Sequence, residues 1–166
     1  MRLFLGSFAQ ISAVGEITAR FEPFFDMRPT PPSNLHLTWY FLGEHPSPAP
    51  FIDRLRELKM IPRLPIALHR VDLFEAHNPR ILYAAPSSPV VARALHEKIA
   101  ALLGMQPHET FTPHVTLARI KHTKQEGWQK ILTQNREVSG EIEPTIYLIE
   151  SRLTPSGPVY LPIEAF

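Results

Sequence analysis

The pattern His-apolar-Thr-apolar occurs twice in this chain of 166 residues, and the spacing of the two copies limits the possible folds more than any other feature. The first copy, HLTW at 36–39, lies in the stretch 34–43, and the second, HVTL at 114–117, lies in 112–120. Both stretches are rich in apolar and aromatic residues and lack a helical period, which is typical of β-strands. One such pattern arises by chance, but two inside predicted strands indicate a shared role.

Alternation along a strand separates the polar from the apolar side chains of each copy. In the first copy the polar face carries His36, Thr38 and Tyr40. The opposite face is apolar and is predicted to be in the core: Leu35, Leu37, Trp39 and Phe41. In the second copy His114 and Thr116 share a face in the same way. Each polar face is therefore predicted to line a wet surface.

The two copies belong to a longer repeat. Strand candidates begin at Arg2 and Arg80, each 34 positions before the histidine of its own motif. We interpret this as a duplication of period 78, with repeats over 1–78 and 79–156 and a final strand over 157–166, all within one bilobal domain spanning 1–166. A pseudo-twofold axis between the halves would place His36 and His114 on opposite walls of one cleft.

The predicted elements give a chain of mixed α/β class, of the α+β type. Strands are predicted over 2–8, 34–43, 65–74, 80–84, 111–120, 141–153 and 159–166. A short, irregular helix is predicted within 10–25, and further helices are predicted over 47–59, 90–103 and 125–134.

Composition excludes several classes of protein. Charged residues make up 20% of the chain and the net charge is +1, which excludes a disordered polyanion and a histone-like polycation. The chain has no cysteine, so it has neither a disulfide framework nor thiolate chemistry. No apolar run approaches the ~20 residues of a membrane span, and the N-terminus is too short for a signal-peptide core. We expect a cytoplasmic protein with no membrane partner.

Two histidines and two threonines on one surface point to acid–base chemistry on a phosphate. An imidazole titrates near ~6.5, so one ring can take a proton while the other gives one. Threonine hydroxyls suit the non-bridging oxygens of a phosphate. A zinc site needs three or four ligands, which this set does not supply. The predicted chemistry is phosphodiester cleavage without a metal or cofactor.

These residues resemble the paired HxTx motifs of the 2H phosphoesterase superfamily. Segments 2–4, 32–38, 41–44, 113–119 and 150–153 resemble its RNA 2′,3′-cyclic phosphodiesterase branch, also called 2′-5′ RNA ligase, while Trp39 replaces the smaller aliphatic residue common there. The resemblance implies a bilobal fold, with two antiparallel sheets around a central cleft, helices outside and no cofactor. It implies that His36 is the proton donor and His114 the acceptor, that Thr38 and Thr116 bind phosphate, and that Arg119 contacts substrate. Simple alternation puts Arg119 on the face opposite His114, so a bulge or a strand end is needed there.

Two further candidate site residues, Tyr40 and Phe4, each have two interpretations. Tyr40 is predicted to stack on a base or to close the strand end, and Phe4 to line the cleft or to pack in the core. The remaining histidines have no paired pattern and are predicted at the surface or in turns: His45, His69, His77, His96, His108 and His122.

The sequence therefore predicts a monomeric enzyme that opens 2′,3′-cyclic phosphate ends of RNA and leaves a 2′-phosphate. Ligation to a 2′-5′ linkage would use the same groups in reverse. The alternatives are a 2H enzyme acting on a nucleotide-sized cyclic phosphate or a 2′-5′ oligoadenylate, and a non-catalytic RNA-binding module.

Overall fold

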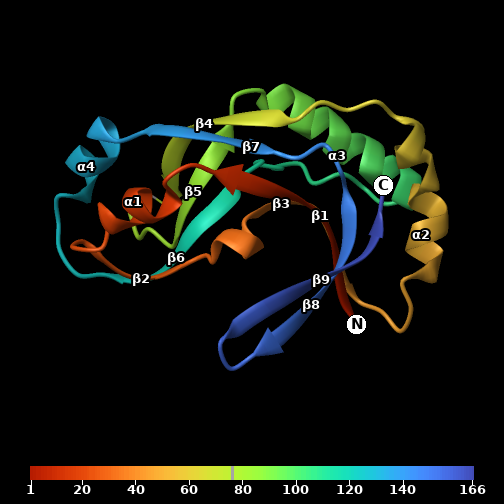
Figure 1. Cartoon of the computed structure of the whole chain (residues 1–166), viewed down its shortest axis with the longest axis horizontal. Coiled ribbons are helices and arrows are strands. Elements are labelled where there is room, and N and C mark those ends of the chain that lie inside the picture. The colour runs from red at the N-terminus through yellow and green to blue at the C-terminus, as the bar shows by residue number, and fades with distance from the viewer. Residues whose placement is uncertain (76) are drawn as a thin grey trace.

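An antiparallel sheet forms the body of the protein in the computed structural model, which describes residues 1–75 and 77–166 (Figure 1). Its nine strands in these residues are β1 (Arg2–Ile11), β2 (Phe25–Pro29), β3 (His36–Glu44), β4 (Ile66–Phe74), β5 (Ile81–Pro86), β6 (Val115–Thr123), β7 (Glu137–Ile142), β8 (Tyr147–Thr154) and β9 (Gly157–Ala165). The strand order is β2-β6-β5-β4-β7-β1-β8-β9, and β3 pairs with both β1 and β6.

Strand β1 joins two groups of strands, β2-β6-β5-β4-β7 and β8-β9. It pairs with β3 on one side and with β8 on the other, and its last residues, Ala9 to Ile11, pair with β7. The predicted α+β class is confirmed. In place of two separate sheets, however, hydrogen bonds connect all the strands, because β1 is long enough to bond to both groups.

The helices lie at the two ends of the molecule (Figure 1). Helices α1 (Val14–Ala19) and α4 (Trp128–Gln134) lie at one end, and α2 (Ala49–Leu55) and α3 (Pro89–Leu103) at the other. Short 3-10 helices cover Pro32–Asn34 and Arg56–Met60. The buried residues of α3 recur at helical spacing: Ala92, His96, Ile99, Ala100 and Leu103. The prediction that His96 is a surface residue was wrong, because His96 belongs to this buried face.

Several element boundaries differ from prediction. The short helix expected within 10–25 is α1, but β1 continues to Ile11, beyond its predicted end at residue 8, and Phe25–Pro29 form an edge strand, β2 on β6, that was not predicted. The helix expected over 47–59 ends at Leu55 and continues as a 3-10 helix. The strand expected over 141–153 is divided into β7 and β8, and Pro144 lies in the break, where it has no N–H for a ladder.

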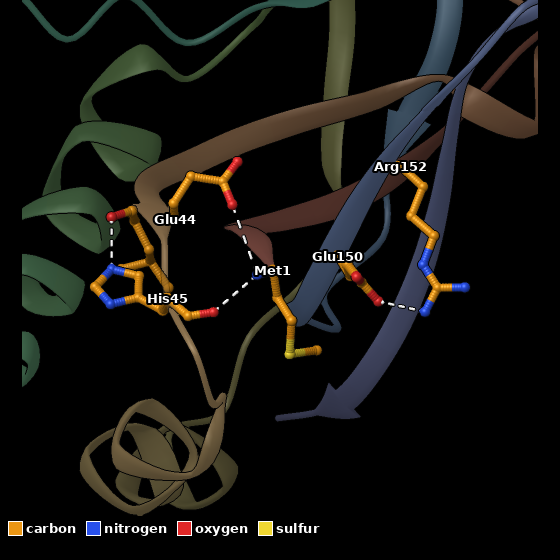
Figure 2. A network of polar contacts seen from close by, with 6 residues as sticks. Met1, Glu44, His45, Glu150 and Arg152 are labelled. Atoms are coloured by element: carbon orange, nitrogen blue, oxygen red, sulfur yellow. Dashed lines mark hydrogen bonds and ion pairs between the residues drawn. The ribbon is translucent and has the colours of Figure 1, made fainter.

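The start of the chain is fixed to the end of β3 (Figure 2). The Met1 amine donates to the carbonyl oxygen of His45 at 2.8 Å and lies 3.6 Å from a carboxylate oxygen of Glu44. Nearby, Arg152 donates to Glu150 on β8. The two contacts of Met1 join the start of β1 to the end of β3, remote from the His36 motif. None of the described helices has the length and apolar character needed to cross a membrane.

Candidate active site

The two motif strands meet at the central residue of each motif. Leu37 of β3 pairs with Val115 of β6 in an antiparallel register, and both side chains are fully buried. This register places His36 beside Thr116, and Thr38 beside His114. All four of these side chains are half-buried on the face opposite the core. One strand pairing thus brings together groups that lie 78 positions apart in the sequence.

The His36 ring is held by its own backbone and by two aromatic side chains. Its Nδ1 lies 2.7 Å from the carbonyl oxygen of Asn34, and the rings of Phe4 and Tyr160 have centroids 5.2 and 4.8 Å from its own. A carbonyl oxygen only accepts, so Nδ1 carries the hydrogen. Nε2 is the nitrogen left for substrate.

His114 is held in the same manner. Its Nδ1 lies 2.8 Å from the carbonyl oxygen of Thr112, again two residues earlier in the chain. Phe74 and Tyr83 pack edge-on to its ring, with centroids at 4.9 and 5.7 Å. The same reasoning leaves Nε2 of His114 free for substrate. Both imidazoles therefore present the same nitrogen, in fixed orientations.

Both histidines resist protonation in the free protein. Burial lowers the pKa of His36 from its ordinary value of 6.5; the hydrogen bond to Asn34 opposes this, and the charges of His114 and Arg119 lower it further. Burial also lowers the pKa of His114, against the bond to Thr112 and with the help of the Arg119 charge. The two rings and Arg119 thus lie close enough for their charges to interact.

A β-bulge brings Arg119 to the histidine side of β6. The β5–β6 register runs from Leu82↔Ala118 to Tyr83↔Thr116, so β6 has one extra residue at this point. The alternation of buried and exposed side chains shifts by one residue at this bulge, since Leu117 and Ala118 are both buried and Arg119 is exposed. The bulge required for Arg119 to reach the cleft is therefore present.

A second bulge corrects two predictions on β3. The β1–β3 register runs from Leu5↔Tyr40 to Gly6↔Thr38 and so contains an extra residue at Trp39. Tyr40 consequently turns inward, and its hydroxyl donates to the carbonyl oxygen of Gln106 at 2.8 Å. Phe41, predicted in the core, is 61% exposed instead.

Phe4 lies beside the site but does not reach solvent. It is 2% exposed and packs on His36, Phe41 and Tyr160. This arrangement fits the core-packing alternative, with the added effect of fixing the His36 ring.

Four residues around the histidines were missed from the sequence: Asn34, Phe74, Tyr83 and Tyr160. Asn34 accepts from His36 through its carbonyl oxygen, while its side-chain amide donates to the carbonyl oxygen of Pro158 on β9 at 3.0 Å. Tyr160 reaches His36 from the same strand. Of these four residues, only Asn34 could have been found from the sequence, because the carbonyl oxygen two residues before a histidine can reach its Nδ1. The aromatic contacts depend on strand register.

A cavity of ≈ 300 Å³ opens from the paired motifs. Thr38 and His114 form part of its wall, and the rings of Phe41, Phe74 and His108 form another part. A larger hollow of ≈ 450 Å³ lies between the end of β1 and β7 and contains no histidine. Among residues 1–75 and 77–166, no three His, Cys, Asp or Glu side chains are grouped to hold a metal ion.

The chain is similar along its whole length to known proteins. Residues 10–146 match the model of the 2′-5′ RNA ligase superfamily. An RNA 2′,3′-cyclic phosphodiesterase of Aquifex aeolicus is 30% identical, over 100% of this chain and 96% of that protein. One from Thermus thermophilus is 29% identical, over 100% of this chain and 89% of that protein.

A solved structure agrees with these sequence matches. A crystal structure of a Thermus thermophilus protein superposes with a TM-score of 0.72 and 27% identity, over 100% of this chain and 97% of that one. The paired motifs, the fold and the family match lead to one conclusion: this chain is a member of the 2′-5′ RNA ligase superfamily of 2H phosphoesterases.

Proposed function

We propose that this protein hydrolyses 2′,3′-cyclic phosphate ends of RNA to 2′-phosphates by metal-independent catalysis with two histidines. The observation that carries the proposal is the Leu37–Val115 pairing, which places two fixed imidazoles and two threonine hydroxyls on one surface. Relatives named RNA 2′,3′-cyclic phosphodiesterase, about as long as this chain, support the substrate class.

The proposed reaction moves one proton at each histidine. Nε2 of neutral His114 takes a proton from water as the water oxygen bonds to phosphorus. Nε2–H of protonated His36 gives its proton to the ribose 3′-oxygen as the bond from phosphorus to that oxygen breaks. The products are a 2′-phosphate and a free 3′-hydroxyl. His36 then regains a proton from solvent, and His114 loses one.

The neighbouring groups act on the phosphoryl oxygens. The hydroxyls of Thr38 and Thr116 donate to the non-bridging oxygens, and Arg119 places a positive charge on the same side. The bound phosphate carries negative charge, which raises the pKa of a nearby imidazole. Substrate therefore promotes the protonation of His36 that burial opposes in the free protein.

Ligation is the reverse of this proton path and remains an alternative use of the same groups, as do a nucleotide-sized cyclic phosphate and a 2′-5′ oligoadenylate. We further propose that the protein works as a monomer, because one chain carries both motifs, and in the cytoplasm, where an RNA substrate is available.

The test is a product analysis with metal-free protein. An RNA oligomer ending in a 2′,3′-cyclic phosphate is incubated with protein treated with EDTA, and the terminal phosphate is assigned by 31P NMR. We expect a 2′-phosphate at an undiminished rate. His36→Ala and His114→Ala should be impaired, whereas His69→Ala, at an exposed histidine of β4, serves as the matched control.

Two results would contradict the proposal. One is a 3′-phosphate product, which would reverse the assignment of the leaving oxygen. The other is activity that is lost with EDTA and restored by zinc or manganese, which would place the enzyme in another mechanistic class. Turnover of the mononucleotide but not of the oligomer would favour the nucleotide-sized alternative.

A further inference from the structure

His96 is a buried histidine that takes no part in the proposed reaction but makes hydrogen bonds with both of its ring nitrogens. It lies on the buried face of α3 and has no exposed surface. Its Nε2 accepts the backbone N–H of His108 at 3.0 Å, and its Nδ1 donates to the carbonyl oxygen of Trp39 at 2.7 Å. A neutral imidazole has one donor and one acceptor, so these two bonds fix a single tautomer and one orientation of the ring.

The bond from Nδ1 ends on the bulge of β3. Trp39 is the extra residue in the β1–β3 pairing and has no partner on β1. His96 supplies a hydrogen-bond donor to the carbonyl oxygen of this unpaired residue. The bulge follows Thr38 directly, and Thr38 lines the cavity at the paired motifs. His96 therefore holds the part of β3 that presents the Thr38 hydroxyl.

The bond to Nε2 ends on the loop that orients the other catalytic histidine. This loop, residues 104–114, joins α3 to β6 and contains no helix or strand. It includes Thr112, whose carbonyl oxygen accepts from Nδ1 of His114 at 2.8 Å. Besides the bond from His108, the ring of Phe111 stacks on His96 with centroids 4.0 Å apart and an interplanar angle of 5°. Because the loop has no strand ladder, such side-chain contacts determine where it lies.

We propose that His96 is a positioning residue, whose two hydrogen bonds hold the Thr38 segment of β3 and the loop that orients His114 in a fixed relative placement. The inference rests on the proposed function, since it concerns groups assigned there to phosphate binding and proton transfer. A misplacement of such groups by about 1 Å is enough to cost about 10²-fold in rate. His96 thus affects the reaction without touching the substrate.

Three substitutions separate the two bonds of His96. His96→Phe keeps an aromatic ring against Phe111 and removes both bonds. His96→Asn places an amide nitrogen near the position of Nδ1 and can keep the bond to Trp39, whereas His96→Gln places an amide oxygen near the position of Nε2 and can keep the bond to His108. Leu103→Ala is the control, because it removes a buried side chain from the same face of α3 and leaves both bonds in place.

Two readouts distinguish positioning from stability. The first is kcat and KM on an RNA oligomer ending in a 2′,3′-cyclic phosphate, referred to the folded fraction measured by circular dichroism. We expect His96→Phe to lower kcat about 10- to 100-fold and to change KM less than about 3-fold, because the loss concerns transition-state geometry. Leu103→Ala should lower the melting temperature and leave kcat of the folded protein unchanged.

The second readout is the tautomer of His114, measured by 15N NMR of its neutral ring. In the wild type the bond to Thr112 should keep the hydrogen on Nδ1. His96→Phe and His96→Asn, which both release the loop, should give a mixture of the two tautomers. His96→Gln keeps the bond to the loop and should retain the single tautomer, as should Leu103→Ala.

Three results would overturn the inference and leave the proposed function standing. They are a kcat of His96→Phe within about 2-fold of the wild type, an equal loss of kcat in Leu103→Ala, and identical His114 tautomers in His96→Asn and His96→Gln. The last comparison decides the matter even where His96→Phe does not fold. A wild type that is inactive on the cyclic-phosphate end would instead refute the proposed function.

Discussion

The site has two walls, one formed by β3 with His36 and the other by β6 with the preceding His114. The walls hold their histidines in the same way but surround them with different side chains. On both walls Nδ1 donates to a carbonyl oxygen two residues earlier, and a bulge follows the threonine. The His114 wall is completed by β4 and β5, through Phe74 and Tyr83. The His36 wall is completed by the β8–β9 hairpin, through Tyr160. The two motifs thus share one backbone geometry, while the surroundings of each ring differ.

Burial and the charge of Arg119 lower the pKa of both rings. Repulsion between two imidazolium charges is mutual, so a proton on either ring also disfavours a proton on the other. The free protein therefore favours neutral imidazoles, and His36, the proposed acid, depends on the bound phosphate for its protonation. The duplication of 1–78 in 79–156 stays a prediction, which the shared carbonyl offset and shared bulge support.

Removing either imidazole should give the largest effect. We expect His36→Ala and His114→Ala each to lower kcat about 10²- to 10⁴-fold, the usual contribution of a general acid or base. Both rings act in one transition state, so the double variant should lose less than the product of the two losses. Steady-state kinetics on a cyclic-phosphate RNA end measures this. Near-normal activity in His36→Ala beside a dead His114→Ala would make the first motif structural.

Arg119→Ala should come next, with a loss of about 10- to 100-fold in kcat/KM, as expected for a hydrogen bond to a charged group. Arg119 is proposed to act on the phosphate through its positive charge, so Arg119→Lys, which keeps the charge but not the planar guanidinium, should recover part of the loss. Unchanged kcat/KM in Arg119→Ala would show that Arg119 does not act on the phosphate.

Tyr160→Ala should sharpen the difference between the walls. The side chain packs on His36, so its removal should admit water and raise the pKa of His36 toward 6.5, with a fall in activity of about 3- to 10-fold. NMR titration of the His36 ring measures the shift, and His114 should move less. Tyr160→Phe keeps the ring and is the control. An equal shift in Tyr160→Phe would assign the effect to the hydroxyl.

The smallest expected effect concerns stability and pH. His96 is fully buried, donates to the carbonyl oxygen of Trp39 at 2.7 Å and accepts from the N–H of His108 at 3.0 Å. Burial lowers its pKa below 6.5, as does the charge of His108, while the bond to Trp39 and the charge of Glu97 oppose this. Between its pKa in the folded protein and 6.5 the unfolded chain binds more protons, so the free energy of unfolding falls as pH drops below 6.5.

His96→Phe removes this titration and should flatten the decline by up to about 1.4 kcal/mol per pH unit. Urea denaturation at several pH values between 7 and 5 measures the slope. The same slope in the variant and the wild type would show that His96 does not titrate on unfolding.

The sequence was sufficient to predict those features that depend only on the local order of residues. The pairs His36–Thr38 and His114–Thr116 follow from alternation, and the α+β class follows from the order of elements. Alternation failed at Tyr40 and Phe41, because a bulge depends on the partner strand and not on the strand itself. The contacts of Tyr160 and Phe74 depend on register between distant strands, so no local signal could have located them.

The central claim is that His36 and His114 form one acid–base pair, with His36 as the acid. A cyclic phosphate whose bridging 3′-oxygen is replaced by sulfur tests it most directly, because a thiolate leaves without being protonated. On this substrate His36→Ala should recover to within about 10-fold of the wild type, while His114→Ala should stay about 10²- to 10⁴-fold impaired. Recovery of His114→Ala instead, or equal impairment of both variants, would contradict the account.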